Sequence, residues 1–189
     1  MKSVSAILLA AGKSSRAGRF KPLLPWNGER FISKVFRSMK EANVFREILV
    51  VTGFLSDLLL PELRTIGADA VFNPEFEKGM HRSIRLGLRS LRPGWSGALI
   101  AHVDQPQLES SDYARIVRAF QHSTKSLVRP CFKGRPGTPA ILGFNYLEEI
   151  EAEPDADHGC AYLFERHPHD VLSVEMDNPG CTKDFDVYP

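Results

Sequence analysis

Apolar runs alternate with amphipathic stretches up to about residue 122, a pattern typical of strands that alternate with helices. The first apolar run, residues 4–9, leads through a polar and basic loop into a helical repeat at residues 30–42. The other predicted strands are residues 47–51, 70–72, 98–103, 126–130, 140–142 and 171–174. The other predicted helices are residues 56–66, 80–91, 145–151, 160–166 and a segment capped by Ser110 or Ser111 that ends near Gln121.

This order of elements predicts the fold class. Strands separated by helices form a mainly parallel sheet with helices on both faces, because a parallel connection must cross over the sheet. After residue 122 the alternation stops, and two short strands flank the turn at residues 133–139. No repeat, low-complexity segment or linker divides the chain. We therefore expect one α/β domain over residues 1–189, with a Rossmann-like three-layer α/β/α architecture.

Two loops are the best candidates for a ligand site. In an open parallel sheet, ligands bind beyond the carboxyl ends of the strands, where loops and helix N-termini meet. One such loop follows Leu9, and the other begins after Val103 with the sequence Asp104-Gln105-Pro106. The two loops are therefore expected to face the same ligand.

The loop after Leu9 has the composition of a polyphosphate cradle. Gly12 lets the backbone approach an anion closely, and Lys13, Arg16, Arg19 and Lys21 concentrate positive charge around it. It is not a Walker A loop, because Ile7 stands where the first glycine belongs, and the chain has no G-x-G-x-x-G motif. The alternative interpretation is a solvated basic turn.

Composition narrows the classes of partner. Lys plus Arg number 24 against 23 Asp plus Glu, and a net charge of +1 gives no reason to expect nucleic acid or a membrane surface as a partner. No apolar run approaches the roughly 20 residues that span a bilayer, and the N-terminus lacks the apolar region of a signal peptide. We expect a cytoplasmic protein. Its cysteines, Cys131, Cys160 and Cys181, are widely spaced and are expected to be reduced thiols.

The first loop carries a resemblance to a known family. The run Leu9-Ala10-Ala11-Gly12-Lys13-Ser14-Ser15-Arg16 is followed by Gly18, Lys21 and Leu23-Leu24. Together they resemble the L-A-A-G-x-S-x-R-x-G-x-x-K-x-L signature of the molybdenum cofactor nucleotidyltransferases, the MobA/MocA-like family. Ala17 stands where many members have Met. Further matches follow in the family's order: Gly79-Met80 with Ser83 and Gly87, Asp104-Gln105-Pro106, Gly134-Arg135 with Gly137 and Pro139, Asp157 with Gly159, and Asp184-Phe185-Asp186.

The resemblance implies a nucleotide-diphospho-sugar transferase-like fold and transfer of a nucleoside monophosphate to a phosphate acceptor, with release of pyrophosphate. It implies that Arg16, Lys21 and Asp104 act in catalysis. The residues that it implies for nucleotide binding are Leu9, Ala10, Ala11, Gly12, Lys13, Ser14, Gly79 and Ser83. The implied partners are a nucleoside triphosphate, a phosphate-bearing small molecule such as molybdopterin, and an acceptor molybdoenzyme.

A magnesium site is expected at Asp104. A carboxylate at the end of an apolar strand can hold Mg²⁺ against phosphates, and Mg²⁺ needs only one or two carboxylates besides them. Asp186 is the second candidate ligand, because Asp184 and Asp186 match the D-x-D-T motif of related enzymes, although Val187 replaces its Thr.

The acceptor side of the resemblance is altered. Thr138 replaces a His in the G-R-x-G-H-P turn, and Ala161 replaces an Arg in the G-D-x-G-A-R motif. One alternative is therefore a nucleotidyltransferase for sugar phosphates or other small phosphates, and another is a nucleotide-binding regulator without catalysis. The pair Ala10-Ala11 resembles the cytidylyltransferase branch, which favours CTP over GTP.

The predicted helix at residues 80–91 carries a stripe of arginines. Its members are Arg82, Arg85, Arg89 and Arg92. We expect a solvated helix face, with a surface for an acidic partner or an anionic substrate as the alternative.

Overall fold

The computed structural model describes residues 1–13, 19–155 and 158–185. Its main sheet has the strand order β10-β7-β9-β6-β1-β4-β5, and β8 pairs with β7. The strands are β1 (Val4–Ala10), β4 (Ile48–Thr52), β5 (Asp69–Phe72), β6 (Gly97–His102), β7 (Leu127–Phe132), β8 (Arg135–Pro136), β9 (Ala140–Gly143) and β10 (Val171–Glu175). Parallel pairs join β1 to β4 and β6, β4 to β5, and β7 to β10, which confirms the predicted mainly parallel α/β fold.

The exceptions are β9, which runs antiparallel to both β6 and β7, and the two-residue strand β8, which runs antiparallel to β7. The chain returns from β7 to β9 through a short turn, and a parallel connection would need a crossover of about a dozen residues or more. The break in the helix–strand alternation after residue 122 therefore corresponds to a reversal of strand direction within the sheet.

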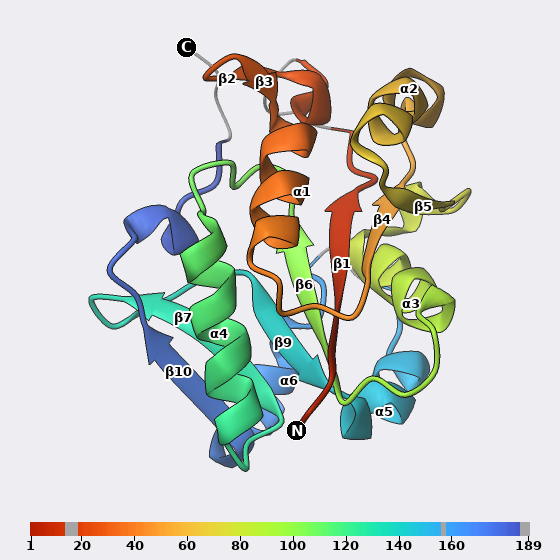
Figure 1. The fold of residues 1–189 in the computed structure, drawn as a ribbon. Helices are drawn as coiled ribbons and strands as arrows, with labels where there is room; N and C mark the ends of the chain where they lie inside the picture. The colour runs from red at the N-terminus through yellow and green to blue at the C-terminus, as the bar shows by residue number, and fades with distance from the viewer. Residues whose placement is uncertain (14–18, 156–157, 186–189) are drawn as a thin grey trace.

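Helices cover both faces of the sheet (Figure 1). They are α1 (Phe31–Glu41), α2 (Ser56–Ile66), α3 (Met80–Ser90), α4 (Ser110–His122), α5 (Leu147–Ala152) and α6 (Ala161–Arg166). Short 3₁₀ helices are η2 (Lys21–Leu23), η3 (Phe76–Lys78), η4 (Phe144–Tyr146), η5 (Pro168–Asp170) and η6 (Pro179–Thr182). In the part of the chain that the structure describes, no helix is long and apolar enough to cross a membrane.

Strand β1 lies at the centre of two hydrophobic cores. Its side chains alternate between the faces of the sheet, as the period of a strand requires. Ala6 and Leu8 pack in the core that includes α1, α2 and α4, and Ile7 and Leu9 pack in the core that includes α3, α5 and α6. Both cores therefore hold the strand that leads into the first candidate loop.

Two local features differ from the sequence prediction. Helix α4 is capped by Glu109, not by Ser110 or Ser111, because the Glu109 side chain accepts from the third helical residue while Asp112 accepts from the Glu109 N–H at 2.9 Å. The hairpin β2 (Pro25–Trp26) and β3 (Glu29–Arg30) was not predicted. Its turn residues Asn27 and Gly28 both have positive φ, 47° and 90°, as a tight hairpin turn requires.

Helix α3 approaches the sheet closely at Gly87. A Cβ at this position would lie 2.9 Å from two side-chain carbons of Ile7 and 3.2 Å from one of Val51. We expect Gly87→Ala to lower the free energy of unfolding by about 1 kcal/mol. Overpacking costs about 1–3 kcal/mol, and alanine returns up to about 1 kcal/mol of helix propensity.

Urea unfolding followed by circular dichroism measures this change. Ile7→Val removes one of the two close carbons, so it should cost less in the Gly87→Ala background than in the unaltered chain. Equal or increased stability of Gly87→Ala would contradict the close packing of α3 on β1.

Candidate active site

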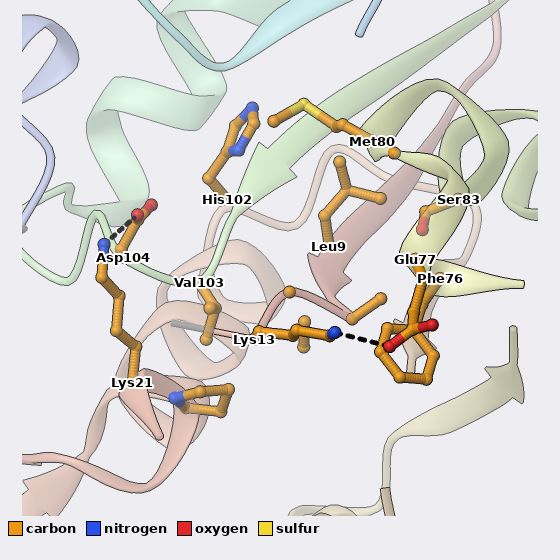
Figure 2. A pocket seen from close by; sticks show the side chains of 15 residues that line it. Leu9, Lys13, Lys21, Phe76, Glu77, Met80, Ser83, His102, Val103 and Asp104 are labelled. Atoms are coloured by element: carbon orange, nitrogen blue, oxygen red, sulfur yellow. Dashed lines mark hydrogen bonds and ion pairs between the residues drawn. The ribbon is translucent and has the colours of Figure 1, made fainter. Parts of the chain in front are cut away.

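The carboxyl ends of β1 and β6 form one wall of a pocket of about 410 Å³, the first pocket (Figure 2). The opposite wall comes from η3 and the start of α3. Its lining residues are Leu9, Ala10, Ala11, Gly12, Lys13, Lys21, Pro22, Phe76, Glu77, Gly79, Met80, Ser83, His102, Val103 and Asp104. The structure thus brings together every predicted site residue that it describes, and the predicted residues Ser14, Arg16 and Asp186 lie outside the described residues.

An ion pair joins the two candidate loops. Lys21 Nζ lies 2.9 Å from Asp104 Oδ2, with side-chain exposures of 9% and 21%. Lys21 is the first residue of the 3₁₀ helix η2, and Pro22 is the second. Proline is tolerated there because the N–H groups of a helix's first turn have no partner within the helix. Because the pair is largely shielded from solvent, it holds the ammonium and the carboxylate in position more firmly than an ion pair on the surface would.

Gly12 lines the pocket, and the described part of the chain places no constraint there that demands glycine. Among the described residues, no heavy atom lies within 4 Å of the position that a Cβ would occupy, and the φ of Gly12 is outside the left-handed region. Contacts with the described residues and backbone conformation therefore do not account for the absence of a side chain. A glycine here leaves room for a ligand to lie against the backbone.

Lys13 crosses the mouth of the pocket to Glu77 of η3. The Nζ–Oε1 distance is 2.5 Å, and both side chains are more than half exposed. An exposed pair contributes only about 0–1 kcal/mol, so an anion in the pocket can readily recruit Lys13. The sequence analysis missed Glu77 and its neighbour Phe76, because η3 is one turn long and leaves no periodic signal.

The start of α3 presents backbone donors to the pocket. Gly79 caps the helix with φ 106° and ψ 172°, a conformation that needs glycine, and no side chain caps the first turn. The free N–H groups and the helix dipole favour an anion there. Ser83 is 4% exposed, and its hydroxyl accepts a 3.0 Å hydrogen bond from Asn73 Nδ2, which fixes it in place.

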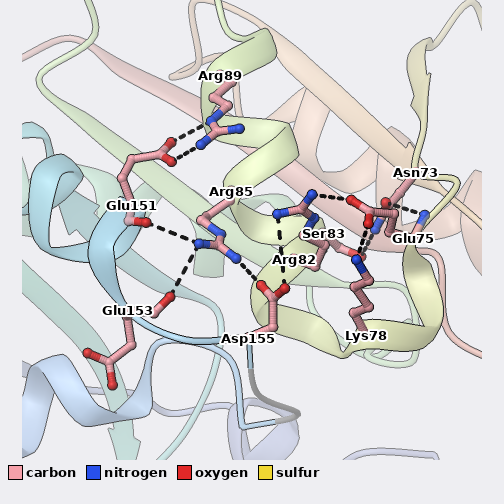
Figure 3. Close-up of polar contacts among 10 residues, drawn as sticks. All are labelled: Asn73, Glu75, Lys78, Arg82, Ser83, Arg85, Arg89, Glu151, Glu153 and Asp155. Atoms are coloured by element: carbon pink, nitrogen blue, oxygen red, sulfur yellow. Dashed lines mark hydrogen bonds and ion pairs between the residues drawn. The ribbon is translucent and has the colours of Figure 1, made fainter.

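The arginine stripe of α3 is engaged within the chain (Figure 3). Arg82 pairs with Glu75, Arg85 with Asp155, and Arg89 with Glu151. The predicted solvated face is wrong for Arg85, which is buried, whereas the Arg89 side chain is 60% exposed. Glu75 directly precedes η3, Glu151 lies in α5 and Asp155 follows α5, so the stripe ties both segments to α3.

A second pocket of about 370 Å³ adjoins the first, because Met80 and His102 line both. Its other lining residues are Ile84, Ile100, Arg129, Pro136, Gly137, Thr138, Ala140, Leu142, His158, Gly159, Cys160, Ala161, Phe164 and Glu165. Most of these side chains are apolar. The altered motif positions Thr138 and Ala161 both lie here. Burial raises the pKa of the Cys160 thiol to about 12, so this cysteine is not a thiolate nucleophile at neutral pH.

Asp104 is suited to a magnesium ion held mainly by phosphates. Among the described residues, no group of three or more His, Cys, Asp or Glu side chains could hold a metal by itself. A carboxylate that is 21% exposed and lines the pocket matches the one or two carboxylates that Mg²⁺ takes beside phosphate oxygens. Phe185, the last described residue, donates its N–H to the Asp104 carbonyl at 3.1 Å, so the C-terminal segment reaches this loop.

Comparisons with known proteins agree on one family. The model of the MobA-like NTP transferase domain matches residues 6–171. The chain is 24% identical over 189 residues to the molybdenum cofactor cytidylyltransferase of Escherichia coli strain K12, across 99% of this chain and 93% of that protein. The crystal structure of Rv0371c from Mycobacterium tuberculosis H37Rv is similar, with TM-score 0.82 and 23% identity over 98% of this chain and 93% of that one.

A second structure of the Mycobacterium tuberculosis protein is a complex with manganese. It has TM-score 0.78 and 19% identity, and the alignment covers 98% of this chain and 96% of that one. At these identities the two structures show a shared fold.

The surroundings of Gly12 predict separate effects on binding and on stability. Gly12→Ala should leave the free energy of unfolding unchanged or raise it by about 0.4–1 kcal/mol, because alanine restricts the unfolded chain. It should weaken the binding of a nucleoside triphosphate about tenfold, or about 1.4 kcal/mol, because the methyl group occupies ligand space. Thermal unfolding and titration calorimetry measure the two effects.

Gly28→Ala is the contrasting variant. Gly28 has φ 90° in the hairpin turn and does not line the pocket, so this change should lower stability and leave the binding of a nucleoside triphosphate unaltered. Unchanged affinity in Gly12→Ala would contradict a ligand at this backbone.

Proposed function

The chain belongs to the family of MobA-like NTP transferase domains, and we propose that it transfers CMP from CTP to a phosphate-bearing small molecule and releases pyrophosphate. The observation that carries the proposal is the first pocket. It places the backbone around Gly12, the ammonium of Lys21 and the carboxylate of Asp104 on one cavity at the end of the sheet. A triphosphate needs donors and a metal-binding carboxylate in this combination.

In this proposal the protein binds and orients the triphosphate. The N–H groups around Ala11 and Gly12 donate to phosphate oxygens, and Lys21 and Arg16 offset the charge that develops on the leaving pyrophosphate. Lys13 contributes from the mouth of the pocket, where it now pairs with Glu77. No covalent enzyme intermediate is required, because holding the two substrates in line supplies much of the acceleration.

We propose Mg²⁺ as the cofactor, held by Asp104 with Asp186 as the second carboxylate. A bound divalent ion neutralises phosphate charge and fixes the orientation of the oxygens around the reacting phosphorus. The manganese in the Mycobacterium tuberculosis structure supports a divalent cation in this fold. The ammonium of Lys21 keeps the Asp104 carboxylate turned toward the pocket that the phosphates enter.

The second pocket is the proposed acceptor site. It shares the lining residues Met80 and His102 with the first pocket, and in this proposal the acceptor phosphate lies at this boundary, next to the nucleotide's α-phosphorus. The Escherichia coli relative is named a molybdenum cofactor cytidylyltransferase, which supports CMP transfer to that cofactor. We therefore propose molybdopterin as one candidate acceptor, with an acceptor molybdoenzyme as a candidate downstream partner. Thr138 and Ala161 replace the His and Arg of the family motifs in this pocket, which favours a screen of other phosphate acceptors beside molybdopterin.

Loss of either member of the ion pair should remove turnover. We expect Asp104→Asn and Lys21→Met each to slow pyrophosphate release about 10²- to 10³-fold, the usual effect of removing one charge-stabilising contact. Circular dichroism should show both variants folded. A coupled pyrophosphate assay with Mg²⁺, CTP and molybdopterin or other phosphate acceptors measures the rate.

Asp177→Asn is the matched control, because Asp177 is 95% exposed and pairs with Arg115 away from both pockets. It should keep the rate of the unaltered chain. Near-normal release from Asp104→Asn would exclude the proposed role of this carboxylate. CTP binding with no release against any acceptor would indicate a nucleotide-binding protein.

The choice of nucleotide is tested separately. With Mg²⁺ present, titration calorimetry should give a lower Kd for CTP than for GTP, as the Ala10-Ala11 pair favours. In this proposal the base lies beside Gly79 and Ser83, where a carbonyl oxygen of the base can accept from the free N–H groups at the start of α3. Ser83→Ala should therefore change the ratio of the two Kd values more than it changes pyrophosphate affinity. A lower Kd for GTP would overturn the assignment of CTP.

A further inference from the structure

Arg129 is the arginine that lines the second pocket, and its guanidinium has no ionic partner among the described residues. Its Nε is buried and makes no hydrogen bond. The guanidinium carbon lies 5.3 Å from the centre of the Phe164 ring, which holds the side chain over the pocket wall. A buried donor without an acceptor is destabilising, so this group is suited to a ligand that supplies the acceptor.

Among the described residues that line the second pocket, Arg129 is the one whose side chain is always cationic, and the histidines His102 and His158 are the other basic side chains there. The pocket floor is apolar, with Ile100, Ala140 and Leu142 from the sheet. Thr138 and Ala161 are uncharged, and the carboxylate-bearing Glu165 is exposed to solvent. An anion that enters the pocket away from the nucleotide therefore meets Arg129 as its strongest partner, and the guanidinium can donate to it in a bidentate way.

The sheet register gives the distance over which such a ligand must extend. Ile100 of β6 faces Ala140 of β9, and β9 pairs in turn with β7, so Arg129 lies two strands away from β6. Neighbouring strands are about 4.8 Å apart, which places Arg129 roughly 10 Å from β6 along the floor of the pocket. The two pockets meet at His102, the last residue of β6.

We propose that Arg129 binds a second anionic group of the acceptor, at the opposite end from the phosphate that reacts. The acceptor class is then an organic phosphate with a flat, apolar body of roughly 10 Å that ends in a carboxylate or another anion. The body lies on Ile100 and Leu142 and beside Phe164. This inference rests on one part of the proposed function, the assignment of the second pocket to the acceptor.

Two synthetic esters test the inference without turnover. Biphenyl-4-yl phosphate has the apolar body and one anionic end, and its 4′-carboxy derivative has an anion at both ends. Titration calorimetry without nucleotide should show about tenfold tighter binding of the carboxy derivative to the unaltered chain, the usual value of one charge-assisted contact. In Arg129→Met this preference should disappear while the affinity for CTP with Mg²⁺ stays unchanged.

Arg118→Met is the matched control, because Arg118 is exposed on α4, in the helix layer on the other face of the sheet. It should keep the tenfold preference. Equal affinity of the two esters for the unaltered chain, or a preference that survives Arg129→Met, would overturn the proposal. Pyrophosphate assays on the same preparations separate this inference from the proposed function. If pyrophosphate is released but the carboxy derivative does not bind more tightly, the role of Arg129 is wrong and the transfer reaction is unaffected. If the carboxy derivative binds more tightly but no pyrophosphate is released, the role of Arg129 holds and the transfer reaction is wrong.

Discussion

The parallel pairing of β1 with β4 on one side and β6 on the other is the constraint on which the rest of the structure depends. Leu9 faces His102 in this register, so the loops that follow β1 and β6 leave the sheet at the same edge. The pair Lys21–Asp104 can form only because of this alignment, since the two residues are 83 positions apart in sequence. The apolar side chains on both faces of β1 hold the alignment in place through two cores.

The sequence was sufficient for the long elements and for most of the first pocket. Apolar runs and helical repeats predict the strands and helices up to residue 122, because burial enforces those periods. Glycine, basic residues and an acid at strand ends locate the pocket, because parallel strands bring their carboxyl ends together. The two-residue strands β2 and β3 are too short for a periodic signal, although Asn27-Gly28 is a recognisable hairpin turn. Phe76 and Glu77 reach the pocket only through the tertiary fold.

Charge partners could not be predicted from spacing along one helix. Arg82 and Arg85 lie on the outward stripe of α3, which a helical wheel marks as solvated. In the structure they bind Glu75 and Asp155, which lie on segments that pack against α3 from either side. Asp155 receives both arginines, with Arg82 at 4.0 Å, and hydrogen bonds from Lys78 and Arg82 lower the pKa of the Glu75 carboxyl. These contacts link the wall of the first pocket to the segment that leads into the wall of the second.

The reversal of β9 separates two groups of strands that contribute mainly to different pockets. One group, with β1, β4, β5 and β6, supplies the loop after Leu9 and Asp104. The other group, with β7 and β9, contributes Arg129, Ala140 and Leu142 to the floor of the second pocket. Substitutions in the hairpin between β7 and β9 can therefore remodel one cavity while the other keeps its strands and its ion pair. For protein engineering, this separation makes the β7–β9 hairpin the part to diversify when a change in the proposed acceptor pocket is sought without a change in the first pocket.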